Sequence, residues 1–317
     1  MSALTVEQQE IRSTGIGSSE IAAIVGLSPW MRPIDVWERK LGLAPDHSTQ
    51  HTSRGRYLEA GLLDWYRDEL RARRGDHVRV ERGRTMRHGS FARVIATPDG
   101  LVYDGDTAER VLEIKSPGWR TQDHWGEPGT DQIPLYYVPQ VTWEMACAGV
   151  SLADAWVLLG EETALYTVAF DANLFSDLVE AAHRFWRDYV ETRKPPPADG
   201  SESYGEHLKR RFPKARGEMR IATIEDDAVA QEFRTAQALL TAAEEQHALA
   251  KQRLIERIGE AEGIEGPGWR ALCREQKGRA SVDTKALALE APDLVAKHTR
   301  EGKPYRVLRP TFSKDHT

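Results

Sequence analysis

The segment ATPDGLVYDGDTAERVLEIK, residues 96–115, carries the residues that decide the predicted fold. Asp99 precedes a glycine that allows a tight turn, and the chain then runs into a strand that ends at Glu113-Ile114-Lys115. In a hairpin the two carboxylates come together. Because side chains two apart on a strand share a face, we expect Glu113 and Lys115 to point into one cleft and Ile114 to point into the core.

Two carboxylates beside a lysine suit a site that binds a hard divalent cation. Mg²⁺ prefers oxygen ligands, and we expect Asp99, Glu113 and the backbone carbonyl of Ile114 to supply them, with Mn²⁺ able to substitute. Glu59, on a neighbouring predicted helix, is the candidate for a second ion or its water, so two ions per site are expected. Lys115 would position or deprotonate the attacking water and neutralise charge on phosphate oxygens. A Pro-Asp-Gly turn and a Glu-x-Lys triplet are each common, so either fragment alone is weak evidence.

Hydrophobic periodicity predicts an α/β (α+β) core with a central sheet flanked by helices. Residues 55–73 recur at helical spacing, and the pattern then changes to the alternation of strands. The expected helices cover residues 55–73, 135–148 and 173–191, and the expected strands cover 78–80, 91–96, 110–114, 155–159 and 164–170. Pro139 falls inside the second of these helices and would be tolerated only if the helix starts there.

The proline-rich stretch KPPPADG, residues 194–200, cannot continue a helix and marks the expected boundary. We therefore assign residues 1–200 to the core and residues 201–317 to a C-terminal accessory region. That region contains a long helix over about 224–262, in which apolar residues fall seven apart. Its sequence leaves open whether this helix extends a subunit interface, clamps DNA or receives a partner.

Composition bounds the class of protein. The 317 residues are 40% hydrophobic, which supports a buried core, and the net charge of −6 argues mildly against nucleic-acid binding. Nine arginines nevertheless lie between Arg67 and Arg93. Two cysteines without metal-binding spacing, no long apolar run and no signal-peptide pattern lead us to expect a cytoplasmic protein without a disulfide framework or membrane span.

Several further segments resemble, in order, those of the lambda-exonuclease and YqaJ-type viral recombinase family of the PD-(D/E)xK nuclease superfamily. The resemblance spans roughly residues 10–190 and implies a restriction-endonuclease-like core with a central mixed sheet and, beyond it, a helical C-terminal extension. The matching motifs are GIGSSEIA (15–22), Pro33-x-x-x-Trp37-x-x-Lys40, Arg54-Gly55-x-x-x-Glu59, Thr97-Pro98-Asp99-Gly100, Glu113-Ile114-Lys115 and Tyr137-x-x-Gln140-Val141.

The resemblance implies an exonuclease of phage or prophage origin. Such an enzyme degrades one strand of linear double-stranded DNA from 5′ to 3′ and leaves a 3′ single strand for a single-strand annealing protein. A homotrimeric ring around DNA is also implied. In this chain the resemblance assigns the terminal 5′-phosphate and the DNA to Arg12, Ser19, Thr97, Tyr137 and Arg54, and catalysis to Glu59, Asp99, Glu113, Lys115 and Gln140.

Two alternatives stay open at this point. The chain could be a single-strand or end-trimming RecB-like nuclease, although two cysteines exclude the four-cysteine iron–sulfur cluster that some of these carry. It could also be a DNA-end-binding module with a vestigial nuclease site. We further expect five tryptophans to pack in the core and not to stack on bases: Trp30, Trp37, Trp65, Trp143 and Trp186.

Overall fold

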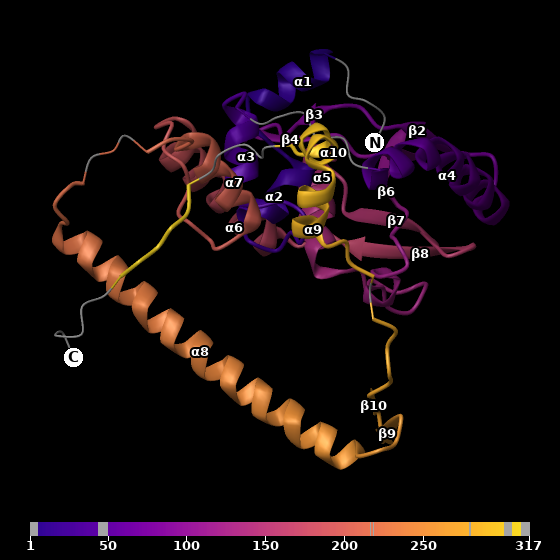
Figure 1. Cartoon of the computed structure of the whole chain (residues 1–317). Helices are drawn as coiled ribbons and strands as arrows, with labels where there is room; N and C mark the ends of the chain where they lie inside the picture. The colour runs from indigo at the N-terminus through magenta and orange to yellow at the C-terminus, as the bar shows by residue number, and fades with distance from the viewer. Residues whose placement is uncertain are drawn as a thin grey trace. The chain divides into compact units, whose positions relative to one another are not determined.

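The computed structural model describes residues 6–43, 50–215, 217, 219–278, 280–300 and 306–311. The chain divides into two compact units, Met1–Arg211 and Phe212–Thr317 (Figure 1). The first unit continues past the boundary predicted at residue 200 and includes helix α7 (Glu202–Arg211). Glu38 binds this helix to the unit, because its carboxylate accepts hydrogen bonds from Arg210 at 2.6 Å and pairs with His207 at 2.8 Å.

A five-stranded mixed sheet forms the centre of the first unit, in the order β2-β5-β6-β7-β8. Strands β6 and β7 are parallel, and every other neighbouring pair is antiparallel. The predicted central mixed sheet flanked by helices is therefore confirmed. The strands are β2 (Val78–Arg82), β5 (Gly100–Asp104), β6 (Thr107–Lys115), β7 (Leu152–Leu159) and β8 (Glu162–Ala169).

The parallel pair β6 and β7 requires a crossover connection, and this connection contains helix α5 (Val138–Ala148). Two short 3₁₀ turns precede it, η1 (Gln122–His124) and η2 (Leu135–Tyr137). Pro139 lies in the first turn of α5, where its missing N–H breaks no helical hydrogen bond. The predicted helix over residues 135–148 thus begins as a 3₁₀ turn and becomes α-helical at Val138.

Helices cover both faces of the central sheet. On one face, helix α4 (Gln50–Arg74) packs Leu62 and Tyr66 against strand residues that include Leu112 and Ile114. On the other, α5 packs against residues that include Val111. This alternation along β6 gives Glu113 the α5 side of the sheet, as the spacing of the residues predicts.

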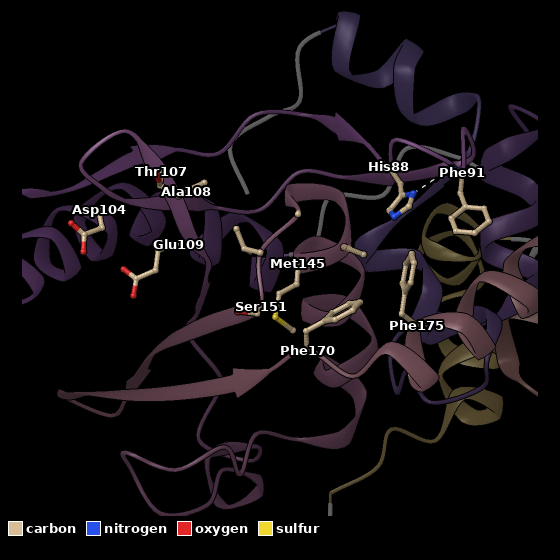
Figure 2. Close-up of a pocket in the computed structure, with 13 residues that line it drawn as sticks. His88, Phe91, Asp104, Thr107, Ala108, Glu109, Met145, Ser151, Phe170 and Phe175 are labelled. Carbon is tan, nitrogen blue, oxygen red and sulfur yellow. Dashed lines mark hydrogen bonds between the residues drawn. The ribbon is translucent and has the colours of Figure 1, made fainter.

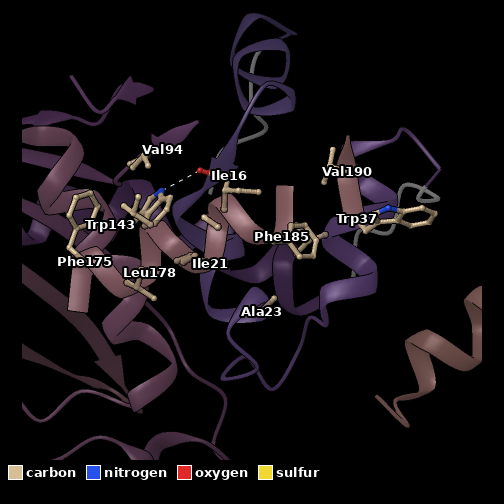
Figure 3. Packing of buried hydrophobic residues seen from close by; sticks show 14 of the residues in the cluster. Ile16, Ile21, Ala23, Trp37, Val94, Trp143, Phe175, Leu178, Phe185 and Val190 are labelled. Atoms are coloured by element: carbon tan, nitrogen blue, oxygen red, sulfur yellow. Dashed lines mark hydrogen bonds between the residues drawn. The ribbon is translucent and has the colours of Figure 1, made fainter. Parts of the chain in front are cut away.

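A small three-stranded sheet joins the N-terminal segment to this core. Strand β1 (Ile16–Gly17) runs parallel to β4 (Val94–Ala96), which also pairs with β3 (Met86–Arg87). The fully buried Trp143 of α5 donates its indole N–H to the carbonyls of Ile16 and Ile95 at 3.2 Å each. Figure 3 shows the bond to Ile16. Around it pack α2 (Ser18–Ile24), α3 (Pro33–Lys40) and α6 (Ala172–Phe185).

The chain continues at either end of this core in further helices. Helix α1 (Val6–Ser13) precedes β1, and a π-helical turn (Trp186–Val190) extends α6.

The first helix of the second unit is the long α8 (Ile224–Ile258). It stops before Gly259, whose φ is positive (+59°), and so is shorter than predicted. The other elements of this unit are β9 (Gly263–Gly266), β10 (Trp269–Leu272), α9 (Thr284–Glu290) and α10 (Pro292–His298). Of the helices described, none is long and apolar enough to span a membrane.

The expectation that the tryptophans pack the core is wrong for two of them. Trp37 and Trp143 are buried and Trp186 packs partly against the core. Trp65 is 42% exposed on α4, and Trp30 is 62% exposed in the loop between α2 and α3. Helical spacing could not reveal this for Trp30, because the residue lies outside both helices.

We predict that Trp143→Phe weakens the junction between the two sheets. The substitution keeps a large buried ring but removes the N–H that bonds the carbonyls of Ile16 and Ile95. A buried acceptor that loses its donor costs about 1–3 kcal/mol, so the free energy of unfolding in urea, followed by circular dichroism, should fall by this amount. Trp119→Phe, at a position 76% exposed, is the control. Equal losses in the two variants would contradict the bridging role of Trp143.

Candidate active site

Asp99 and Glu113 face one another across the hairpin formed by β5 and β6. Gly100, the first residue of β5, pairs with Leu112, so the Asp99 that precedes it lies beside the end of β6. A carboxylate oxygen of Asp99 accepts the backbone N–H of Ile114 at 2.8 Å. The structure therefore brings together the two carboxylates that the sequence predicted, and it ties one of them to the backbone of the third proposed ligand.

A close backbone crossing fixes the bend that presents Asp99. Gly83 donates its N–H to the Asp99 carbonyl at 3.1 Å. A side chain at Gly83 would place its Cβ 1.8 Å from the Pro98 carbonyl oxygen, so only glycine fits. Sequence analysis did not identify this residue, because a glycine in a loop between strands gives no sign of the segment that crosses it.

Glu113 lies between Lys115 and Gln140. One oxygen of Glu113 accepts hydrogen bonds from the Lys115 ammonium and, at 2.5 Å, from the Gln140 amide, and Lys115 also contacts the Gln140 carbonyl oxygen at 3.5 Å. The ammonium lies 4.7 Å from the centre of the Tyr137 ring. The predicted catalytic residues of β6 and α5 thus form one connected group.

Burial and like charge shift the protonation of this group. Burial, reinforced by the neighbouring Glu113 carboxylate, raises the pKa of Asp99 to about 8. Burial by itself lowers the pKa of Lys115, but the charges of Glu113, Tyr137 and Asp99 together raise it above its ordinary value. Lys115 therefore stays cationic at neutral pH.

Glu144 is a member of the group that sequence analysis missed. It is fully buried one turn after Gln140 on α5, and it accepts a hydrogen bond from the Gln140 amide at 3.1 Å. Burial, followed by the charge of Glu113, raises its pKa well above the usual value, and a hydrogen bond to Ser18 opposes this. The signal was present in the sequence, because residues four apart lie on one helix face.

Glu59 and Arg54 reach the site from α4. Glu59 is buried, and one of its oxygens binds Arg82 at 3.0 Å. Its charge contributes to the raised pKa of Asp99, which shows that the carboxylates are close enough to interact. Arg54 donates to the backbone carbonyl of Ser116 at 3.0 Å, directly after the catalytic lysine candidate.

The predicted phosphate-binding residues lie at the ends of the parallel strands β1 and β4. Arg12 donates to the Ser19 hydroxyl at 2.9 Å. Thr97 follows β4, but its hydroxyl contacts that of Thr85 at 3.0 Å. In the described part of the chain, no direct contact joins Thr97 to Arg12 or Ser19. The structure thus pairs two of the three predicted residues and places the third after the adjacent strand.

A buried ion pair between Lys40 and Glu20 holds the backbone of Arg12. Lys40 binds Glu20 at 2.6 Å and donates to the Arg12 carbonyl at 2.8 Å, while Glu20 also accepts the N–H of Gly17 at 2.7 Å. A Cβ at Gly17 would lie 2.7 Å from the Arg12 guanidinium, so a side chain at this position would displace that guanidinium. Lys40 and Glu20 belong to the motifs that the sequence matched, but their contact crosses between helices and was not predicted.

The two carboxylates of Asp99 and Glu113 are suitable ligands for a hard divalent cation. Among the residues that the structure describes, no group of three or more His, Cys, Asp and Glu side chains is arranged to hold a metal ion. Asp99 and Glu113 nevertheless present two buried carboxylates whose mutual repulsion a cation would relieve. Two carboxylates completed by backbone oxygen, water and phosphate are the usual protein environment of Mg²⁺.

The arginine run from Arg67 to Arg93 is largely neutralised within the unit. Most of its members pair with acidic side chains, so the run does not form an uncompensated basic surface. The pairs within 4 Å are Arg67–Asp64, Arg71–Asp76, Arg73–Glu69, Arg74–Asp104, Arg74–Glu109, Arg79–Glu81, Arg79–Asp106, Arg82–Glu59 and Arg93–Glu191.

A cavity of about 840 Å³ lies elsewhere on the first unit. Its lining includes His88, Phe91 and Phe175 together with Asp104 and Glu109, which Figure 2 shows at opposite ends. None of the predicted site residues lines it. The candidate site is therefore separate from this cavity.

A known protein family matches the part of the chain that contains the candidate site residues. Residues 7–151 match the family described as the YqaJ-like viral recombinase domain. The resemblance found in the sequence motifs is thereby confirmed, and all the predicted site residues, from Arg12 to Gln140, fall inside the matched segment.

Individual relatives extend the comparison. The protein YqaJ of Bacillus subtilis (strain 168), described as uncharacterized, is 26% identical over 306 residues, which cover 92% of this chain and 89% of that protein. The alkaline exonuclease LHK-Exo of Laribacter hongkongensis is 20% identical with a TM-score of 0.47, covering 66% of this chain and 98% of its own. A phage-related exonuclease from Haemophilus somnus 129PT is 11% identical with a TM-score of 0.40, covering 57% and 96%.

The raised pKa of Asp99 predicts how stability depends on pH. The folded protein keeps this proton to about pH 8, whereas the ordinary value is 3.8, so metal-free wild type should lose stability as the pH rises between these values. Asp99→Asn cannot ionise and should escape this loss. In EDTA, the melting temperature of Asp99→Asn relative to wild type should therefore increase with pH. Asp64→Asn, at an exposed carboxylate, is the control. An offset that stays constant with pH would contradict the assignment.

Proposed function

We propose that this protein is a magnesium-dependent exonuclease that degrades one strand of linear double-stranded DNA from 5′ to 3′. The observation that carries the proposal is the convergence of Asp99, Glu113 and Lys115 at the end of one hairpin, with Asp99 bonded to the Ile114 backbone. The match to the YqaJ-like viral recombinase domain supports a role in DNA processing.

The residues have distinct parts in the proposed hydrolysis. Mg²⁺, when bound by Asp99, Glu113 and the Ile114 carbonyl, would supply an acidified water and polarise the scissile phosphate. Lys115 stays cationic, so we assign it to stabilising negative charge on the phosphate oxygens and not to accepting a proton. Gln140 orients Glu113 and Lys115 by bonding both. Glu59 is the candidate for a second ion or its water.

We extend the proposal to recognition of the DNA end. Arginine with hydroxyl groups suits a terminal phosphate, because the guanidinium gives charge-assisted hydrogen bonds. Arg12 and Ser19 already meet, and Thr97 follows the neighbouring strand. Ser18 and Glu144 link this pocket to Gln140 beside Glu113. A 5′-phosphate held there would set the polarity, since the bonds cut first lie inward from it.

The assembly and the partner belong to the same proposal. A ring of three copies would enclose duplex DNA and keep an acidic protein on its substrate. The product, a 3′ single strand, would pass to an annealing protein in recombination of the phage type. Light scattering of the full chain measures the mass of the assembly and so tests whether three copies associate.

Cleavage assays test the proposed site. We expect Asp99→Ala, Glu113→Ala and Lys115→Ala to lower the rate on end-labelled linear duplex in Mg²⁺ by at least about 10²-fold, with Mn²⁺ supporting activity in the wild type. Asp64→Ala removes an exposed carboxylate of α4 and is the matched control. Melting curves establish that the variants fold. Near wild-type rates for Asp99→Ala would show that the site lies elsewhere.

End recognition is tested with two substrates that differ in one group. Linear duplex with a 5′-phosphate should be degraded faster than the same duplex with a 5′-hydroxyl. Arg12→Ala should shrink this difference, because it removes the guanidinium and leaves the metal-binding carboxylates intact. Arg187→Ala, on an exposed arginine paired with Asp188, should keep the difference. Equal rates on both ends in the wild type, or release of nucleotides from the 3′ end, would contradict the pocket and the polarity.

A further inference from the structure

Trp30 is the starting point because its ring is exposed and also contacts two tyrosines next to the proposed site. It is 62% exposed, whereas Trp37, seven residues later, is buried. A single exposed hydrophobic residue is ordinary, whereas a contiguous exposed patch marks a surface that another molecule can cover. The contacts of Trp30 decide which molecule this is.

The loop that carries Trp30 is held firmly. Ser28 is buried, and its hydroxyl accepts the backbone N–H groups of Trp30 at 3.3 Å and Met31 at 3.1 Å. The N–H groups of Leu27 and Ser28 in turn bond the Ala22 carbonyl of α2 at 2.8 and 3.1 Å. The ring is therefore presented by an ordered backbone, which lowers the entropy lost when a ligand binds it.

Trp30 belongs to an aromatic group, which we call the aromatic ledge and define as Trp30, Tyr136 and Tyr137. The centre of the Trp30 ring lies 4.9 Å from that of Tyr136 in an edge-to-face contact (81°), and 5.9 Å from that of Tyr137. Tyr136 and Tyr137 meet at 4.7 Å. Tyr137 is anchored below by the buried Trp125, at 5.5 Å. The tyrosines thus brace Trp30 while most of its surface stays in solvent.

The ledge begins at the proposed catalytic group. The Lys115 ammonium lies 4.7 Å from the centre of the Tyr137 ring, and the same ammonium binds Glu113. A phosphate beside Lys115 would bring its attached nucleoside to the ledge. Burial raises the pKa of Tyr136 to about 12, so its hydroxyl is neutral and does not repel the DNA backbone.

We propose that the aromatic ledge binds an unpaired nucleobase at the 5′ end of the strand being cut, with Trp30 stacking on its face. This inference rests on the proposed nuclease function and adds a base-binding subsite to it. A flat aromatic base matches a flat exposed ring, and stacking tolerates every sequence because all bases have a π-face. The position of the ledge next to a cation that suits phosphate favours a nucleotide over a protein partner.

Stacking also gives the site a way to open the duplex end. A base that rests on Trp30 leaves its partner, and the scissile bond can then approach Asp99 and Glu113. The energy of stacking offsets part of the cost of separating the terminal pair. The ledge therefore acts on binding of the strand and not on the hydrolytic step itself.

Fluorescence of 2-aminopurine tests the ledge without cleavage. Duplex with a 5′-phosphate and 2-aminopurine at the 5′-terminal position is bound in EDTA by wild type, Trp30→Phe and Trp30→Leu. Stacking quenches this fluorophore, so its fluorescence in the complex should be lower with wild type and Trp30→Phe than with Trp30→Leu. The same base placed deep in the duplex should not respond to the substitution. Trp65→Leu, at another partly exposed tryptophan of the unit, is the matched control and should quench like wild type. Equal quenching by Trp30→Leu and wild type would overturn the proposal.

Kinetics on a substrate without the terminal base separates stacking from a structural effect. With Mg²⁺, Trp30→Leu should raise KM about tenfold on intact duplex and change kcat little. On duplex with an abasic 5′-terminal nucleotide, Trp30→Leu and wild type should have equal KM. A tenfold rise in KM that persists on the abasic duplex would mean that Trp30 only supports the fold. No change in KM on either substrate would mean that a protein, and not a base, covers Trp30. Either result would overturn the proposal. Absence of cleavage in the wild type would instead contradict the nuclease function, and the fluorescence result would still decide the ledge.

Discussion

Three carboxylates lie out of water within interaction range of one another, and the rest of the site depends on how they are balanced. The charge of Glu113 raises the pKa of both Asp99 and Glu144, and the charge of Asp99 also raises that of Glu144. Isolated buried charge is costly, so each carboxylate needs donors or a proton. Lys115 and Gln140 meet this need at Glu113. The residual repulsion makes the cluster a place where a cation gains binding energy.

Helix α5 connects this cluster to the rest of the unit. Gln140 and Glu144 lie on one face, and Trp143 beside them bonds the carbonyls of β1 and β4. The proposed catalytic residues and the Arg12–Ser19 pair are therefore parts of one buried framework. A substitution in α5 can therefore disturb both groups of residues. A substitution of the exposed Trp30, by contrast, breaks no buried hydrogen bond of the carboxylate cluster.

Short sequence patterns correctly predicted the features that a single hairpin or helix determines. Asp99, Glu113 and Lys115 were found because one hairpin brings them together, and strand alternation places Glu113 and Lys115 on one side. The two-residue strand β1 was missed, since its pairing with β4 joins residues that are distant in sequence. Glu144 was also missed, although its position four residues after Gln140 on one helix face could have revealed it. The exposure of Trp30 was also hidden, because nothing in the periodicity of α2 or α3 governs a side chain in the loop between them.

The central claim is that Asp99 and Glu113 hold a metal ion. Crystals soaked in Mn²⁺ measure this directly, because anomalous scattering locates the ion without assumptions about activity. The account predicts an anomalous peak between the two carboxylates, near the Ile114 carbonyl, that disappears in Glu113→Gln. A Mn²⁺ peak only at other positions, or a peak that persists unchanged in Glu113→Gln, would contradict it.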